Sequence, residues 1–133
     1  MRSVIVPSRI FDPDPNVLET VRSRIQTNLH DLGEDLSALD RLSARTVLEE
    51  AVAGADFVVE AAPEDLALKR QLFKAIEVAA PPEAVLATNT SVIPIAQIVA
   101  DVADRIGCPG THWWNPPYRN PLDRASLHLV GRS

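Results

Sequence analysis

The chain has 133 residues, 46% of them hydrophobic, and a formal net charge of −5 at pH 7. This length suits one domain with its own hydrophobic core and is short for a two-domain enzyme. The acidic balance argues against nucleic acid or an anionic membrane as the main partner. We find neither the run of about 18 apolar residues that a membrane-spanning helix needs nor the apolar stretch of a secretory signal. Cys108, the single cysteine, excludes an internal disulfide and fits a cytoplasmic location.

The first half of the chain predicts a strand, a long helix and shorter elements. Residues 9–12 favour a short strand that ends on Asp12, and Asp14 and Pro15 fit the N-cap and the first position of a helix. An apolar stripe at helical spacing follows, made by Leu18, Val21, Ile25, Leu29 and Leu32. Gly33 fits the C-cap of this helix. Residues 34–43 are ambiguous, although Leu42 fits a short strand, and residues 46–52 fit a turn or two of helix closed by Gly54.

The second half predicts a further alternation of strands and helices. Residues 56–62, DFVVEAA, form the clearest strand, because they are β-branched and lie between Gly54 and Pro63. A helix follows from about Glu64 and ends before Pro81. Its apolar face consists of Leu66, Phe73, Ile76 and Ala80. The brief apolar run within 84–88 predicts a buried parallel strand. A short helix is then predicted from Ile95, Ile98, Val99 and Val102. This alternation is typical of an α/β fold with a mainly parallel sheet.

A further strand is predicted near residues 110–113, and two polar clusters lie at the ends of predicted strands. The first is Thr88-Asn89-Thr90-Ser91, and the second follows Gly110 as Thr111-His112-Trp113-Trp114-Asn115. In an open α/β sheet, ligands bind in the crevice outside the carboxyl ends of the strands. We therefore expect Ser91, His112 and Asn115 to converge there. A histidine can take a hydroxyl proton at neutral pH, and hydroxyl and amide groups can orient the oxygen that loses it.

Three segments together resemble the NAD-binding domain of the 3-hydroxyacyl-CoA dehydrogenase family, which includes lambda-crystallin-like and carnitine dehydrogenase-like members. They are IFDPDP, ADFVVEAAPEDLALKRQLF, and LATNTS with GTHWWNPP, and they lie within residues 9–122. Their separations fit the family as well: Glu64 precedes Ser91 by 27 residues (91 − 64), and Ser91 precedes His112 by 21 (112 − 91). The resemblance implies a Rossmann-type parallel sheet flanked by helices.

The resemblance also implies NAD as the cofactor. Asp12 would accept hydrogen bonds from the adenosine ribose hydroxyls, which favours NAD over NADP. Glu64 and Lys69 would line the nicotinamide-ribose side, and Asn89 would belong to the same cofactor-binding set. No metal ion is implied.

The implied reaction is the oxidation of a 3-hydroxyacyl-CoA, or a related 3-hydroxy substrate, to the 3-oxo product. Ser91 would bind the substrate hydroxyl, His112 would be the general base, and Asn115 would hold substrate and cofactor in line. The partners would be small molecules, without nucleic acid or membrane. The sequence does not distinguish acyl-chain lengths, or a CoA thioester from a carnitine-like substrate.

Several of these residues also have simpler structural interpretations. Asp12 fits turn chemistry before Pro13, and Glu64 fits a first-turn helix carboxylate favoured by the helix dipole. Lys69, taken alone, fits a solvated helix residue. We also expect Trp113 and Trp114 to form core and pocket wall. His30 and His128 are expected at the surface, and Cys108 is expected to be chemically inert.

The sequence departs from the family pattern at its start. The glycines, Gly33, Gly54, Gly107, Gly110 and Gly131, do not form the G-x-G-x-x-G turn that binds a pyrophosphate. Residues 3–6 cannot replace the first strand, because a parallel crossover needs about a dozen residues before the next strand. The lost strand would be central in the order 3-2-1-4-5-6. We therefore expect a gap or an exposed edge in the sheet, through which copies of the chain could associate.

The sequence also departs downstream of His112. The family places a glutamate twelve residues after this histidine, and this chain has Arg124 there (112 + 12). We divide the chain into a partial NAD-binding domain, residues 1–122, and a divergent tail, residues 123–133. The family's helical carboxyl-terminal dimerisation domain is expected to be absent. Two alternatives stay open: a catalytically inactive binding or structural remnant, and a partial chain that needs another polypeptide to complete its site.

Overall fold

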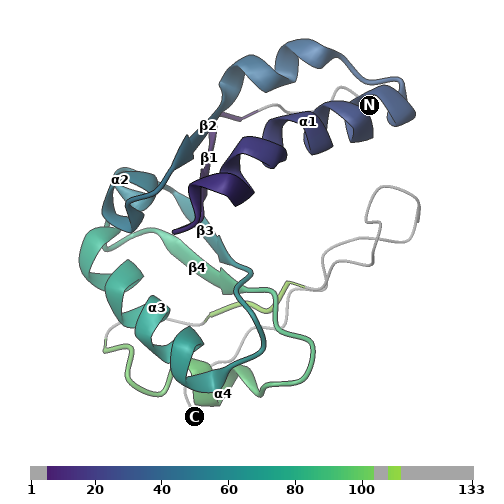
Figure 1. The fold of residues 1–133 in the computed structure, drawn as a ribbon. Coiled ribbons are helices and arrows are strands. Elements are labelled where there is room, and N and C mark those ends of the chain that lie inside the picture. Colours follow the sequence, from purple (N-terminus) through teal and green to yellow (C-terminus); the bar gives the residue numbers. More distant parts are fainter. Residues whose placement is uncertain (1–5, 104–107, 112–133) are drawn as a thin grey trace. The chain divides into compact units, whose positions relative to one another are not determined.

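The computed structural model describes residues 6–103 and 108–111. The chain divides into two compact units, Met1–Ala51 and Val52–Ser133, and Figure 1 shows the helices and strands of each. Each unit is described by itself. Within the described ranges, no helix is both long enough and apolar enough to cross a membrane.

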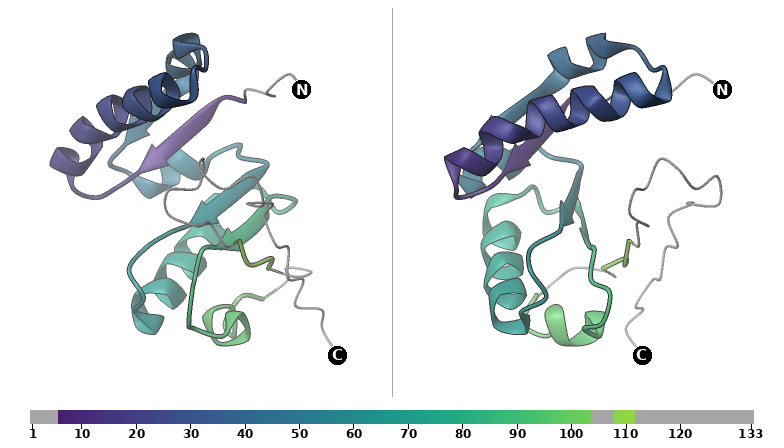
Figure 2. Two further views of the ribbon diagram at one scale, coloured as in Figure 1. Left: turned by 90° about the vertical axis from the view of Figure 1, so that its right-hand side faces the viewer. Right: turned by 45° about the vertical axis from the view of Figure 1, so that its right-hand side comes forward.

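The first unit is a strand–helix–strand crossover. Strand β1 (Ser8–Phe11) pairs in parallel with β2 (Leu42–Arg45). Helix α1 (Pro15–Leu32) and the short 3₁₀ helix η1 (Leu36–Arg41) connect the two strands. α1 packs on η1 and β2, and both views in Figure 2 show it running alongside the strand pair. The predicted strand, the long helix and the strand at Leu42 are therefore confirmed.

The ends of α1 follow the predicted capping chemistry. The Asp14 side chain accepts a hydrogen bond from the Asn16 amide at 2.9 Å, and Pro15 occupies the first helical turn. At the other end Gly33 is left-handed, with φ of 66°. The apolar stripe between these caps is only half-buried: α1 has no fully buried residue, and Leu32 is 45% exposed. A hollow of about 300 Å³, half open to solvent, lies beside this stripe and is lined by Leu18, Val21 and Leu42 among others.

The second unit repeats the crossover. Strands β3 (Phe57–Glu60) and β4 (Val85–Thr88) pair in parallel, and helix α3 (Leu66–Ala79) connects them. Helix α2 (Leu48–Val52) spans the boundary between the two units and ends near Gly54, which has φ of 68°. A parallel bridge between Thr88 and Gly110 adds the start of the next predicted strand. The predicted strands and the α3 helix are confirmed, with small shifts at their ends.

The two faces of strand β3 differ in burial. Residues alternate between the faces along a strand. Glu60, which contacts α3 through Lys69, is 5% exposed, whereas Phe57 and Val59 on the opposite face are 50% and 42% exposed. α3 buries Lys69, Phe73 and Ile76. The core of this unit therefore lies between α3 and the face of the strands that carries Glu60.

The predicted short helix after Ser91 is confirmed, but it ends before the apolar repeat does. α4 contains only Ile95–Ile98, and Val102 donates its amide to Val99 in a separate turn. The apolar residues that suggested a longer helix are β-branched and weak helix formers. The next residues are instead held by α3, through the ion pair of Arg70 with Asp101. Tertiary contacts therefore override the helical spacing.

Among the described residues, the strands form two separate two-stranded parallel sheets, β1–β2 and β3–β4. The α/β class with parallel strands is confirmed, and the expected interruption of the sheet stays a prediction. The predicted convergence of Ser91 with His112 and Asn115 stays a prediction, since the last two lie outside the described residues. The same holds for Trp113, Trp114, Arg124 and His128.

Candidate functional site

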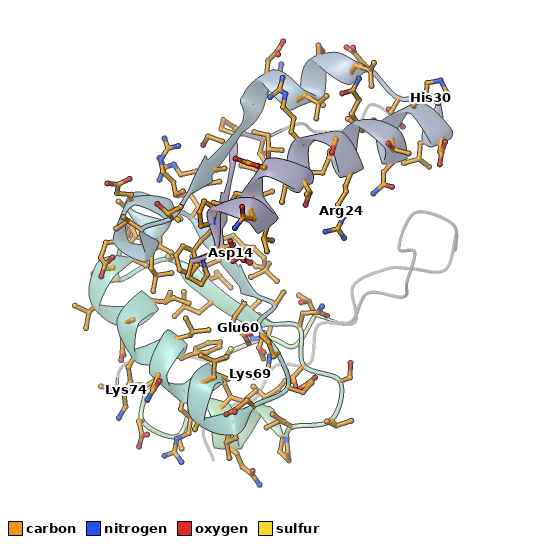
Figure 3. The ribbon with its side chains drawn as sticks, viewed as in Figure 1. Asp14, Arg24, His30, Glu60, Lys69 and Lys74 are labelled. Atoms are coloured by element: carbon orange, nitrogen blue, oxygen red, sulfur yellow. The ribbon has the colours of Figure 1, made fainter. Side chains whose placement is uncertain are left out.

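A buried polar cluster lies at the carboxyl end of β3. The Lys69 ammonium on α3 donates to Glu60 Oε1 and to the Ala62 carbonyl, at 2.9 Å each. Glu60 Oε2 accepts a hydrogen bond from the Thr88 hydroxyl at 2.7 Å. Figure 3 shows Glu60 and Lys69 side by side between α3 and the strands. One carboxylate thus links β3, β4 and α3.

The turn between β3 and α3 is held by the same cluster. The Ala62 amide donates to Glu60 Oε1, while the Ala62 carbonyl accepts from Lys69. At the helix end of the turn, Asp65 caps α3 by accepting from the Leu68 amide at 3.0 Å. Both ends of the turn are therefore fixed, and Glu64 lies between them.

Glu64 holds the loop that follows β4. Its carboxylate accepts hydrogen bonds from the Thr90 hydroxyl, at 2.9 Å to Oε2, and from the Ser91 amide. The bond from the Ser91 amide is the main reason why the pKa of Glu64 lies below its ordinary value of 4.5. The Thr90 hydroxyl and the charge of Lys69 lower this pKa further. Since these bonds favour the carboxylate form, Glu64 holds the loop in its ionised state.

We define the strand-end loop as residues 89–91. The Asn89 amide donates to the Glu60 carbonyl at 2.7 Å, and the Asn89 side chain is half-buried. Ser91 is exposed. Just before the loop, the Thr88 amide donates to the Pro109 carbonyl, and the Thr88 carbonyl accepts from the Thr111 amide. The loop is thus a fixed polar surface at the carboxyl ends of parallel strands, where ligands bind in folds of this class.

In the first unit, Asp12 follows directly after β1. Its Oδ1 accepts a hydrogen bond from the Asp14 amide at 2.9 Å, and its own amide donates to the Arg45 carbonyl. The side chain is half-buried. The turn chemistry expected from the sequence is therefore present. Asp12 also lies at the end of a strand, which is where a Rossmann-type fold carries a ribose-binding carboxylate.

The interpretation of Lys69 as a solvated helix residue is wrong. Its side chain has no exposed surface, and that of Glu60 is 2% exposed. Sequence reasoning missed Glu60 altogether, although both residues gave a signal. Lys69 continues the apolar stripe of α3 between Leu66 and Phe73, and Glu60 alternates with Phe57 and Val59 on the face of β3 toward α3.

Two further residues, His30 and Cys108, were expected to lie outside the site. The His30 side chain is 83% exposed on α1, and Figure 3 shows it at the end of that helix. Cys108 is buried, and burial, assisted by the charge of Glu60, raises the pKa of its thiol to about 12. The described residues contain no group of three or more potential metal-binding side chains.

The family profile described as "3-hydroxyacyl-CoA dehydrogenase, NAD binding domain" matches residues 6–122. The chain belongs to this family. It is 38% identical over 116 residues to an L-carnitine dehydrogenase of Streptomyces coelicolor, covering 84% of this chain and 36% of that protein. It is 34% identical over 116 residues to a probable 3-hydroxybutyryl-CoA dehydrogenase of Bacillus subtilis, covering 81% of this chain and 40% of that relative.

A solved structure shows the same likeness. The 3-hydroxybutyryl-CoA dehydrogenase of Escherichia coli K12 superposes with a TM-score of 0.77 at 30% identity, covering 85% of this chain and 25% of that one. The chain spans 36% of the length of the Streptomyces relative, which is little more than a third. The resemblance found in the three sequence segments and the Rossmann-type fold are both confirmed.

Proposed function

We propose that this chain forms the NAD-binding part of a dehydrogenase that oxidises a 3-hydroxyacyl-CoA, or a carnitine-like 3-hydroxy substrate, to the 3-oxo product. The observation that carries the proposal is the family match over residues 6–122. The strand-end loop supports it, because Glu64 and Glu60 hold this polar loop where a Rossmann-type fold binds its ligands. Both substrate classes carry a secondary alcohol, so one acid–base chemistry serves either.

The described residues fit NAD in part. Asp12, at the end of β1, would accept hydrogen bonds from the adenosine ribose, and Glu64 and Asn89 would face the nicotinamide side. Lys69 does not fit a direct contact, because its side chain has no exposed surface and its ammonium is bonded to Glu60. When bound, NAD would accept the hydride from the substrate carbon.

The residues of the chain would handle the proton and the oxygen. Ser91, exposed at the strand-end loop, would hydrogen-bond the substrate hydroxyl. His112 would take the hydroxyl proton as general base, and Asn115 would keep the reacting groups in line. The roles of His112 and Asn115 rest on the family's sequence pattern.

The test is an assay of NADH formation from 3-hydroxybutyryl-CoA and from L-carnitine. The chain would be extended with a strand–GxGxxG–helix segment and the family's helical domain. We expect turnover with one of the substrates, an increase with Arg124→Glu, and loss with His112→Ala. His30→Ala is the matched control, since His30 is exposed and remote in sequence from the loop. Turnover that survives His112→Ala would disprove the assigned base, and NAD binding without turnover would favour the inactive remnant.

Two further expectations accompany this proposal. Self-association through an exposed sheet edge stays a prediction, which analytical ultracentrifugation would check. The cytoplasmic location likewise stays a prediction.

A further inference from the structure

Lys69 has a place in the structure that its implied cofactor role does not explain. The side chain is 0% exposed, although a lysine rarely lies in a core unless it is paired. Its ammonium bonds both the Glu60 carboxylate and the Ala62 carbonyl. We propose that Lys69 is a positioning residue, which sets the strand-end loop 89–91 through the β3–α3 turn and Glu64. This inference rests on the proposed function for the importance of the loop, but not for the contacts that connect Lys69 to it.

The first step runs from Lys69 to the turn. Both backbone polar groups of Ala62 are held by the ion pair, the carbonyl by Lys69 and the amide by Glu60. Pro63 follows, and its fixed φ limits how the next residue can move. Asp65 donates its amide to the Pro63 carbonyl at 2.7 Å and starts α3. The backbone of Glu64 therefore has little freedom while the ion pair is intact.

The second step runs from the turn to the loop. Glu64 reaches across to the Thr90 hydroxyl and the Ser91 amide. A shift of the turn would move this carboxylate away from both donors. Glu60 gives a parallel route, because its carbonyl accepts from the Asn89 amide and its carboxylate from the Thr88 hydroxyl. Asn89 is thus bonded directly to Glu60, and Thr90 and Ser91 are connected to the ion pair through Glu64 and the turn.

Two other roles for Lys69 make different predictions. If Lys69 only neutralised Glu60, then removing both charges together would restore both the stability and the loop. If Lys69 acted only by touching the cofactor, its substitution would leave the loop of the cofactor-free chain unchanged. The positioning role predicts that the loop changes without cofactor, and that it stays changed when stability has been restored.

The test is NMR spectroscopy of the 133-residue chain without cofactor. The Ser91 amide reports the conformation of the loop in two ways. Its hydrogen-exchange rate reports the bond to Glu64, and the pH midpoint of its chemical shift reports the titration of the Glu64 carboxylate. The variants are Lys69→Met and the double variant Glu60→Gln/Lys69→Met, which leaves no unpaired charge at the ion pair. Lys74→Met is the matched control. Lys74 lies on the same helix, is 58% exposed and pairs with Asp101, and Figure 3 shows it pointing away from the cluster.

In the double variant we expect the Ser91 amide to exchange about 10-fold faster, the value for one lost hydrogen bond, and its pH midpoint to rise toward 4.5. Lys74→Met should keep both values. If Lys69→Met does not fold, the double variant alone decides. Wild-type exchange and an unchanged midpoint in the double variant would overturn the proposal. Because no readout involves NAD, failure of the extended chain to bind NAD would refute the proposed function without deciding the role of Lys69.

Discussion

The Nζ atom of Lys69 on α3 lies 2.9 Å from Oε1 of Glu60 at the end of β3, and the two side chains are 0% and 2% exposed. A buried ion pair is close to neutral for stability while both partners are present, because desolvation offsets the attraction. Removing one partner leaves a buried charge without its counter-ion. The pair is therefore a point at which a single substitution has a large effect and a double substitution a small one.

We expect Lys69→Met to lower the free energy of unfolding by about 3–5 kcal/mol, the usual cost of an unpaired buried charge. Glu60→Gln/Lys69→Met should recover part of this loss, since no buried charge remains, while the Ala62 carbonyl still lacks the donor that Lys69 provided. Urea denaturation followed by circular dichroism measures both. The control Lys74→Met should stay within about 0.5 kcal/mol of the wild type. A Lys69→Met variant as stable as the wild type would contradict the burial of this pair.

The pH dependence of the strand-end loop follows from Glu64. Its pKa is lowered in the folded chain, chiefly by the Ser91 amide, so folding favours the ionised form. The resulting stabilisation is complete above the unfolded pKa, near 4.5, and is lost as the pH falls through the lower folded value. We expect the Ser91 amide resonance to shift in this acidic range. Glu64→Gln should remove the shift, and Glu83→Gln, at an exposed glutamate, should leave it in place.

Cys108 should react slowly with thiol reagents. Burial and the charge of Glu60 raise the pKa of its thiol from 9.0 to about 12, so at pH 8 the reactive thiolate is about 10³-fold rarer than in the unfolded chain. Labelling with a chromogenic disulfide reagent should be slow in buffer and fast in denaturant. Equal rates in the two conditions would show that the thiol is accessible in the folded chain.

Much of the fold was predictable because its signals are local. Asp14, Pro15 and Gly33 mark the ends of α1 through hydrogen bonds and backbone angles that involve only neighbouring residues. The β-branched run of β3 between Gly54 and Pro63 is equally local. The short helix α4 is also predictable, but its end at Ile98 is not, since the following residues contact α3 through pairs about thirty positions apart, such as Arg70 with Asp101.

The candidate site was predictable only in part. The polar cluster at residues 88–91 is visible in the sequence, and so is its place after a strand. The partnership of Glu60 and Lys69 is not, because it depends on which face of β3 packs against which face of α3. The apolar spacing predicts the stripe of α3 that contains Phe73, but it does not predict that Lys69, on the same stripe, is buried. A charged residue at an apolar position of one element is a reason to search the facing element for its partner.

Gly33 at the end of α1 should tolerate no side chain without cost. Its φ of 66° is left-handed, and a residue with a Cβ atom adopts that conformation at a cost of about 1 kcal/mol. No neighbouring atom would clash with an added Cβ, so the cost is conformational only. We expect Gly33→Ala to lower the unfolding free energy by about that amount in urea denaturation. Gln26→Ala, at an exposed position within α1, is the control and should be neutral or slightly stabilising.

Substitutions at Asp12 can separate its expected role in cofactor binding from its role in the turn before α1. Its Oδ1 accepts the Asp14 amide at 2.9 Å, and an asparagine would keep that acceptor while it removes the charge. Asp12→Asn should therefore keep the α1 N-terminus, which the amide resonance of Asp14 reports. Asp12→Ala should disturb it.

The binding experiment uses calorimetric titration with NAD and NADP. The 133-residue chain contains no G-x-G-x-x-G pattern among its 5 glycines, and we expect it to bind NAD weakly or not at all. An amino-terminal strand–GxGxxG–helix extension should restore binding. In the extended chain, Asp12→Asn should weaken NAD binding about 10-fold, because a hydrogen bond to a charged acceptor is worth more than one to a neutral acceptor. It should also narrow the preference for NAD over NADP, since the carboxylate no longer repels the 2′-phosphate. Asp31→Asn on α1 is the control, and unchanged affinities for both cofactors in Asp12→Asn would remove Asp12 from the binding site.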